Sequence, residues 1–402
     1  MSERVRRRVF LLGSTGSIGT SALDVVRDFA RRGDARFEVV GLAAARNGDA
    51  LVAQAREFGA RAIALADDSV DLEGHAALPT GTRVLRGADA ARELLRDHAR
   101  RGDLVLAAMV GAAGIEPVLE AIALGCDVAL ANKEALVAAG SIVMPAAARA
   151  GVRIIPVDSE HNALFQCLKA STAMDEVRRV VLTASGGPFR MRSRSEMARA
   201  TVDDALAHPT WRMGPKVTID SASLMNKALE LIEAHWLFGL GAERIDAIIH
   251  PQSIVHGFVE YLDGSVLAQL SPPDMRTPIQ QAMCDPQRFD GPSRKLDFTA
   301  LRSLDFEPVD LERFPAITLA HRVISAGGSA GAVLNAANEI AVRAFLDRRI
   351  GFLDIAEVVR ATLDACHPCP VASLADVRSA DAAARAHAES LTRLPTPTRT
   401  HA

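Results

Sequence analysis

The chain has 402 residues, of which 49% are hydrophobic and 24% are charged, and its formal net charge is −3. This length predicts two or three domains, and the composition is typical of a globular protein. The near-neutral charge predicts neither a nucleic-acid partner nor a charged membrane surface as partner, and no apolar run predicts a membrane span.

Five cysteines, an odd number in a large chain, do not predict a secreted disulfide scaffold, and we expect a cytoplasmic protein. Cys366 and Cys369 have the C-x-x-C spacing of a redox pair or of half a zinc site. No second C-x-x-C is present, so a role for this pair stays open.

Residues 1–152 predict a Rossmann-like domain that binds NADP. Short apolar strands are expected at 8–14, 37–44, 61–67, 103–111 and 126–132, and helical patterns at 17–29, 48–59 and 115–125. Strands that are apolar on both faces and alternate with helices predict an α/β fold with a parallel sheet.

The rest of the chain changes in character after residue 152. We expect a central α+β catalytic domain over 153–290, a linker over 291–311, a C-terminal helical bundle over 312–392 and a disordered tail over 393–402. Asp263-Gly264 predicts the turn of a hairpin, and the proline-rich stretch 271–278 predicts no regular element.

A glycine-rich turn follows the first predicted strand. Gly13 would permit the tight turn, Gly16 would let a pyrophosphate approach, and Gly19 would let the helix pack near the sheet. The start of the helix would then offer free N–H groups to phosphate. The pattern alone is weak, and an ordinary strand-to-helix turn is the alternative.

The end of the second predicted strand indicates which dinucleotide would bind. An NAD site usually has an acidic residue there, but this chain has Arg46 and Asn47. Because arginine suits a 2′-phosphate by charge and geometry, we predict NADP. The alternative is that Arg46 is only a surface residue.

Three carboxylates could form a metal site. Asp158 and Glu160 would share one face of an extended chain, and oxygen ligands suit Mg²⁺ or Mn²⁺. Glu230 shares a helix face with Lys227 and with Glu233. An exposed acidic turn and a solvated helix with ordinary ion pairs remain the alternatives.

Small polar residues could surround a phosphate group. Ser185, Ser221 and Ser223 lie in small-residue contexts, and Asn226 and Lys227 add an amide and a cation. A lone serine in such a place is more often a turn or cap residue.

The segment 208–215 predicts a loop, because His208-Pro209 and Gly214-Pro215 bracket it. Trp211 in such a loop would suit a lid over a reactive intermediate, or it could be a buried anchor.

Several longer motifs occur together in the order shown by one enzyme family. They are GSTGSIG, ANKEAL, PVDSEHNALFQCL, TASGGPF, HPTWRMGPKVTIDSASLMNKALELIEAHWLF and HPQSIVHGFVEYLDGSVLAQLSPPDMRTPI, with LNAANEIAV nearer the C-terminus. On these motifs, which cover 9–285 densely, the chain resembles the 1-deoxy-D-xylulose 5-phosphate reductoisomerase family. Ala45 and Gly257 depart from the commonest form, with little effect expected.

The resemblance implies an oxidoreductase that depends on NADPH and on a divalent metal, Mg²⁺ or Mn²⁺. The family rearranges the phosphosugar 1-deoxy-D-xylulose 5-phosphate to an aldehyde. NADPH then reduces that aldehyde to 2-C-methyl-D-erythritol 4-phosphate, in the non-mevalonate pathway to isoprenoid precursors. The resemblance also implies a homodimer.

It further implies roles for individual residues of this chain. The implied metal ligands are Asp158, Glu160 and Glu230. The implied catalytic residues are Lys133, Asp158, Glu160, His208 and Glu230. The implied substrate contacts are Lys133, Ser159, Glu160, Ser185, His208, Trp211, Met213, Ser221, Asn226, Lys227 and Glu230. The implied cofactor contacts are Gly13, Thr15, Gly16, Ser17, Ile18, Arg46, Asn47, Asn132, Glu134 and Gly214. Glu233 and His256 match positions that the family keeps near its site.

Two other functions are the alternatives. One is an NADP-dependent dehydrogenase of the semialdehyde or homoserine type, which would leave the three carboxylates unexplained. The other is a non-catalytic NADP-sensing module, which would not need Lys227, Glu230 and the loop around Trp211 together.

Overall fold

The computed structural model of this protein describes residues 6–70, 72, 75–209, 211 and 214–393. The chain forms two compact units, each built from separated stretches. The first comprises Met1–Ala135, Val143–Phe165 and Asp274–Lys295, and the second comprises Leu136–Ile142, Gln166–Pro273 and Leu296–Ala402. The division into three domains and a linker stays a prediction.

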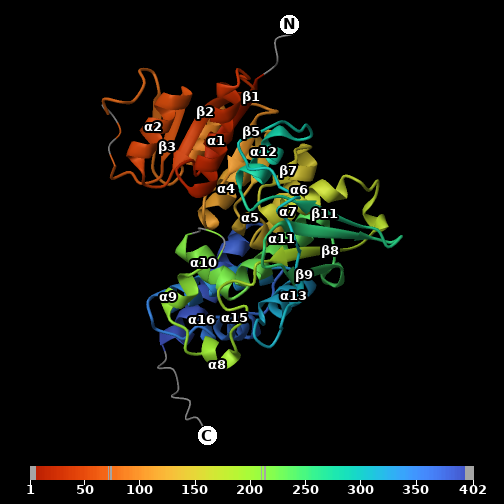
Figure 1. Cartoon of the computed structure of the whole chain (residues 1–402). Coiled ribbons are helices and arrows are strands. Elements are labelled where there is room, and N and C mark those ends of the chain that lie inside the picture. The colour runs from red at the N-terminus through yellow and green to blue at the C-terminus, as the bar shows by residue number, and fades with distance from the viewer. Residues whose placement is uncertain (1–5, 71, 73–74, 210, 212–213, 394–402) are drawn as a thin grey trace. The chain divides into compact units, whose positions relative to one another are not determined.

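A parallel sheet of seven strands forms the centre of the first unit, and its early strands are red and orange in Figure 1. The strand order is β4-β3-β2-β1-β5-β6-β7. The strands are β1 (Arg7–Leu12), β2 (Phe37–Ala44), β3 (Ala62–Leu65), β4 (Arg83–Arg86), β5 (Leu104–Ala107), β6 (Asp127–Leu130) and β7 (Ile154–Pro156).

Helices follow most of these strands, as the alternating pattern predicts. They are α1 (Ser17–Arg31), α2 (Gly48–Phe58), α3 (Ala90–His98), η1 (Ala112–Gly114), α4 (Ile115–Ala123), α5 (Glu134–Val137), α6 (Gly140–Ala150) and α7 (Ser159–Leu168). Strand residues Leu11, Leu42 and Ile63 are fully buried together with Leu23 of α1. The parallel α/β prediction is therefore confirmed. The sequence pattern does not indicate β4, an edge strand with one buried residue.

The segment 274–295 packs onto the first unit. Its helix α12 (Arg276–Cys284) contacts α1, and Phe289 lies edge-on to Phe29 with ring centres 5.8 Å apart. The prediction that 271–278 form no regular element is wrong for 276–278, which form the first turn of α12. Pro278 fits because it lies in the first turn of α12, where the missing N–H costs no hydrogen bond.

The second unit has a mixed sheet in the order β11-β10-β8-β9-β12. The strands are β8 (Val177–Ala184), β9 (Ile245–Ile249), β10 (Val255–Tyr261), β11 (Val266–Leu270) and β12 (Glu307–Pro308). β8 and β9 are parallel, and the other neighbours are antiparallel. The predicted hairpin at Asp263-Gly264 is confirmed as the β10–β11 connection.

Helices make up most of the regular secondary structure of the second unit. They are η2 (Met174–Glu176), α8 (Arg194–Met197), α9 (Val202–Leu206), α10 (Pro215–Ala222), α11 (Met225–Phe238), η3 (Ala242–Arg244), α13 (Ala316–Ala326), α14 (Ala330–Leu346), α15 (Asp354–Ala365) and α16 (Leu374–Arg393). The last four, blue in Figure 1, form the predicted helical region, in which α14 packs against α15 and α16. Arg393, placed in the predicted tail, is helical, and 394–402 lie outside the described residues.

Within the described ranges, no helix combines the length and the apolar character that crossing a membrane requires.

Candidate functional site

The predicted site residues of the first unit gather at the carboxyl ends of its parallel strands. The glycine-rich turn follows β1, Arg46 follows β2, 132–134 follow β6 and 158–160 follow β7. β1 lies between β2 and β5 in the sheet. The strand order therefore reverses beside β1, with β2 to β4 on one side and β5 to β7 on the other. Ligands of open α/β sheets bind at this edge, beside such a switch in strand order.

The turn after β1 contains three glycines, and a different structural feature explains the absence of a side chain at each. Gly13 has φ +90°, and a side chain on it would collide with the carbonyl of Ala108, just after β5. A side chain on Gly19 would collide with the backbone of Gly13 and Ser14, so Gly19 sets how closely α1 approaches the turn. Gly16 is exposed at the N-cap of α1, and an added Cβ would meet only the Gly13 oxygen, at 3.4 Å. Gly16 therefore leaves open space for a ligand.

Arg46 has a largely free side chain just after β2. The Arg46 side chain is 87% exposed, and its Nε lies 3.8 Å from a carboxylate oxygen of Asp67. Hydrogen bonds from Ser69 lower the pKa of Asp67, and Arg46 adds to that effect. The side chain of Asn47 accepts a hydrogen bond from the Ala50 N–H at 3.1 Å and thereby caps α2. Arg46 can therefore reach an anion without breaking a buried contact.

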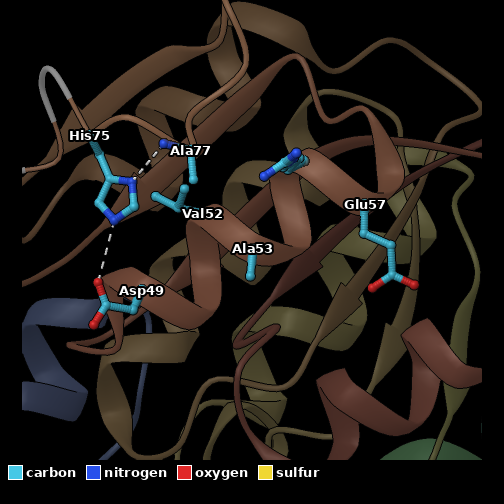
Figure 2. A pocket seen from close by; sticks show the side chains of 7 residues that line it. Asp49, Val52, Ala53, Glu57, His75 and Ala77 are labelled. Atoms are coloured by element: carbon cyan, nitrogen blue, oxygen red, sulfur yellow. Dashed lines mark hydrogen bonds and ion pairs between the residues drawn. The ribbon is translucent and has the colours of Figure 1, made fainter.

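A cavity of about 410 Å³ lies beside α2, and none of the predicted site residues lines it. Figure 2 shows His75 facing Asp49, with Nε2 3.5 Å from the carboxylate and Nδ1 accepting from the Ala77 N–H at 3.2 Å. Glu57, on the same wall, pairs with Arg27 at 2.5 Å. His75 pairs with Asp49 inside the lining and Glu57 pairs with Arg27 outside it, and we assign no role to this cavity.

The buried side chain of Asn132 holds the loop after β6 in place through hydrogen bonds. Its Nδ2 lies 2.7 Å from the Met109 oxygen, 3.0 Å from the Gly111 oxygen and 2.8 Å from the Glu134 carboxylate. Its Oδ1 accepts from the Ala135 N–H at 2.9 Å, which fixes the start of α5. Asn132 therefore ties the loop after β5 to the loop after β6.

Lys133 and Asp158 form an ion pair at this edge, although they are separated by 25 positions in the chain. The Ser159 hydroxyl donates to the Glu160 carboxylate. The expectation that Asp158 and Glu160 share one face of an extended chain is wrong, because α7 begins at Ser159 and Glu160 lies in its first turn. A carboxylate there interacts favourably with the positive end of the helix.

In the second unit, His208 connects two predicted substrate contacts. Its Nε2 lies 3.1 Å from the Ser185 hydroxyl, and its Nδ1 accepts from the backbone N–H of Trp211 at 2.8 Å. Burial lowers the pKa of His208 below its ordinary value of 6.5. The ring is therefore neutral near pH 7, with its proton on Nε2 facing Ser185.

The predicted phosphate-binding residues lie around the junction of α10 and α11. Ser221 is in the last turn of α10, and Asn226, Lys227 and Glu230 are in the first turns of α11. The Asn226 amide and the Lys227 ammonium both donate to the Glu230 carboxylate. This ion pair confirms the predicted shared helix face of Lys227 and Glu230, and both side chains are almost fully buried.

Two unusual backbone conformations bring the loops of this region together. Leu224, buried between α10 and α11, has φ +57° and redirects the chain between the two helices. Gly187 has φ +61°, and an added Cβ would lie 3.0 Å from the Ser221 oxygen. The loop that carries Ser185 therefore packs against the end of α10.

The remaining predicted residues are placed as follows. Glu233 is buried on α11, and His256 is buried on β10 with its Nε2 3.1 Å from the Ser271 oxygen and hydroxyl. Gly214 caps the start of α10, whereas Met213 lies outside the described residues. Asp220, a buried carboxylate on α10, is not among the residues predicted from the sequence.

Three family models match the chain. They are 1-deoxy-D-xylulose 5-phosphate reductoisomerase over residues 9–140, its C-terminal domain over 154–238, and the DXP reductoisomerase C-terminal domain over 270–387. The chain is also 49% identical over 387 residues to the 1-deoxy-D-xylulose 5-phosphate reductoisomerase of Zymomonas mobilis, covering 96% of this chain and 97% of that protein. This chain belongs to the 1-deoxy-D-xylulose 5-phosphate reductoisomerase family. The resemblance drawn from the motifs is confirmed.

Solved structures of the same family agree in fold. The Zymomonas mobilis reductoisomerase in complex with NADPH superposes with a TM-score of 0.89 at 47% identity, covering 96% of this chain and 99% of that chain. A DOX-P reductoisomerase in complex with NADPH, fosmidomycin and magnesium gives a TM-score of 0.88 at 39% identity, covering 96% and 98%. The predicted fold class is therefore confirmed for this reductoisomerase-family chain.

Proposed function

We propose that this chain is an NADP-dependent oxidoreductase that converts 1-deoxy-D-xylulose 5-phosphate to 2-C-methyl-D-erythritol 4-phosphate, with NADPH as reductant and Mg²⁺ as metal. The observation that carries the proposal is its identity of 49% to a reductoisomerase over nearly the full length of both proteins. Solved relatives named with NADPH and magnesium support the choice of cofactors. We therefore prefer this activity to the two alternatives, an NADP-dependent dehydrogenase and a non-catalytic NADP-sensing module.

The proposed NADPH site is the carboxyl edge of the first sheet. The exposed Gly16 and the N–H groups of α1 would receive the pyrophosphate, and Arg46 would receive the 2′-phosphate. NADPH would supply the reducing equivalent for the aldehyde. Asn132 and Glu134 would shape the site from the loop after β6. The full proposed set of cofactor contacts is Gly13, Thr15, Gly16, Ser17, Ile18, Arg46, Asn47, Asn132, Glu134 and Gly214.

The proposed metal ligands are Asp158, Glu160 and Glu230. Three carboxylates are the hard oxygen donors that Mg²⁺ prefers, so the donor set fits the ion. A bound divalent cation would polarise the hydroxyketone oxygens as a Lewis acid. The Lys133 ammonium already pairs with the Asp158 carboxylate, and the Lys227 ammonium pairs with the Glu230 carboxylate. Each of these carboxylates therefore already binds a positively charged group.

The proposed phosphate pocket consists of Ser185, Ser221, Asn226 and Lys227. The buried ammonium of Lys227 neutralises Glu230 in this structure. A phosphate at Lys227 and a cation at Glu230 would each replace one half of that pair, so both buried charges would stay compensated. Phosphate binding far from the reacting carbons would contribute to orienting the substrate.

The proposed lid is the segment around Trp211 and Met213, which would keep water from the aldehyde. His208 would hold this segment to Ser185 through its two ring nitrogens. Lys133 and Ser159 are proposed as further substrate contacts, and a cytoplasmic homodimer is proposed as the working form.

The deciding experiment follows NADPH absorbance at 340 nm after mixing the protein with 1-deoxy-D-xylulose 5-phosphate and Mg²⁺. We expect turnover that stops with a chelator, resumes with Mg²⁺ and yields 2-C-methyl-D-erythritol 4-phosphate by mass spectrometry. NADH in place of NADPH is the control for the Arg46 assignment. Absence of metal-dependent NADPH oxidation by a folded protein would overturn the proposal.

A further inference from the structure

Helix α14 carries two buried asparagines that the proposed activity does not use. Asn335 and Asn338 are 1% and 0% exposed, in a helix whose other buried residues are all apolar or glycine. Burying an amide is unfavourable unless it is hydrogen-bonded, so each asparagine needs a partner. Asn335 finds one within its own helix, because its Nδ2 lies 3.1 Å from Glu339 Oε1.

Asn338 instead reaches a different helix, 118 positions away in the chain. Its Nδ2 donates to Oδ1 of Asp220 on α10 at 2.9 Å, and both side chains are buried. The other oxygen of Asp220 lies 2.8 Å from the Lys216 ammonium. The Asn338 carbonyl oxygen has no hydrogen-bond partner among the described residues. The bond to Asp220 is thus what orients this amide.

Helix α10 joins two parts of the proposed active site. Its first turn, with Lys216, directly follows the proposed lid and Gly214, and its last turn carries Ser221 of the proposed phosphate pocket. Asp220 precedes Ser221 and holds Lys216 on one side and Asn338 on the other. A shift of α10 would therefore move the lid attachment and the phosphate pocket together.

We propose that Asn338 and Asp220 are positioning residues, whose hydrogen bond anchors α10 to α14 and so fixes the phosphate pocket at Ser221. The inference rests on the proposed function. Packing alone does not require this pair, because apolar residues of similar size stabilise a core at least as well as a buried polar pair. A directional bond between a carboxylate and an amide instead defines one position of α10 relative to α14.

The test compares Asn338→Ala with Asn335→Ala, which removes a similarly buried amide whose hydrogen bond lies within α14. We expect similar losses in Tm, but only Asn338→Ala should raise KM for the phosphosugar and the Kd for inorganic phosphate, each by roughly tenfold. The Kd for NADPH, measured by fluorescence, should not change in either variant. Equal effects of the two substitutions on phosphate binding would overturn the proposal.

An exchange of the two side chains tests the bond itself. Asn338→Asp should place two carboxylates against each other and weaken phosphate binding, whereas Asp220→Asn with Asn338→Asp restores one amide and one carboxylate. Recovery of most of the phosphate affinity in the double variant supports the proposal, and no recovery in a folded double variant contradicts it. Phosphate titration by calorimetry needs no turnover. A wild type without turnover would refute the proposed function, whereas the phosphate affinities of the variants would still test the role of Asn338 and Asp220.

Discussion

His208 and Ser185 are joined by a hydrogen bond of 3.1 Å between the ring Nε2 and the serine hydroxyl. The opposite ring nitrogen accepts the backbone N–H of Trp211 at 2.8 Å. Because Nδ1 must be unprotonated to accept, only the neutral ring can make both bonds. This one side chain therefore links the loop after β8 to the proposed lid, and it does so in a single protonation state.

The neutral state of His208 predicts an acid limit to activity. Burial lowers its pKa below 6.5, so the unfolded chain takes up this proton at a higher pH than the folded chain does. The stability that His208 contributes is therefore complete above pH 6.5 and is lost as the pH falls towards the lowered pKa. We expect kcat/KM to fall over that same acid range, because protonation removes the acceptor for Trp211.

A pH profile of His208→Gln checks this prediction. The variant should lose roughly tenfold or more in kcat/KM and should lose the acid limb that His208 causes. His321→Gln is the control, since His321 bonds the Ile245 oxygen at 3.0 Å, belongs to none of the proposed site residues and should leave the limb unchanged. An acid limb of the same midpoint in His208→Gln would contradict the assignment.

Gly19 and Gly16 should respond differently to alanine. A Cβ at Gly19 collides with the backbone of the turn, so Gly19→Ala should destabilise the folded protein by about 1–3 kcal/mol. At Gly16 the same methyl makes only an ordinary 3.4 Å contact, so Gly16→Ala should leave Tm unchanged but weaken NADPH binding. Thermal unfolding and cofactor titration of both variants separate the two effects, and equal Tm losses would refute the distinction.

Local spacing explains what the sequence could predict. The turn from Gly13 to Gly19 and the pair Lys227–Glu230 are set by short separations, so a strand-to-helix pattern or one helical turn is sufficient to place them. The hairpin at Asp263-Gly264 is likewise a local signal.

Contacts between distant segments could not be read from such patterns. Lys133 reaches Asp158 because β6 and β7 are neighbours in the sheet, and strand order is not written in periodicity. The extended interpretation of Glu160 overlooks a local signal, because Asp158 and Ser159 are residue types that favour a helix start and an acidic residue favours the first turn. The bond between Asn338 and Asp220 depends on the packing of α14 against α10, which only the fold reveals.

Arg46 predicts the choice of dinucleotide. A hydrogen bond to a charged group contributes about 1.5–3 kcal/mol, so Arg46→Asp should lower kcat/KM for NADPH by roughly 10- to 100-fold while leaving NADH use nearly unchanged. Asp67→Asn is the matched control, because it removes the ion partner of Arg46 at 3.8 Å and should preserve or slightly improve NADPH binding. Unchanged NADPH selectivity in Arg46→Asp would remove Arg46 from the proposed 2′-phosphate site.

Glu230→Gln tests the proposed metal ligand and the buried ion pair together. The substitution keeps the shape of the side chain but removes the charge that faces Lys227. We expect Mg²⁺-dependent turnover to fall by roughly 100-fold or more. Replacing a residue that only contacts a metal ligand already lowers metal affinity or activity by about 10- to 100-fold. The Kd for NADPH should stay the same. Inorganic phosphate should bind more tightly, because the Glu230 carboxylate no longer competes with it for the Lys227 ammonium.

The loss of the pair also has a cost in stability that must be separated from catalysis. Breaking a buried ion pair by removing one partner costs about 3–5 kcal/mol, so Glu230→Gln should lower Tm, and adding Lys227→Met should restore Tm without restoring turnover. Glu243→Gln, at an exposed position, is the control for removing a carboxylate. If NADPH binding and turnover fell in parallel in Glu230→Gln at a temperature where it is folded, the proposed role as a metal ligand would be wrong.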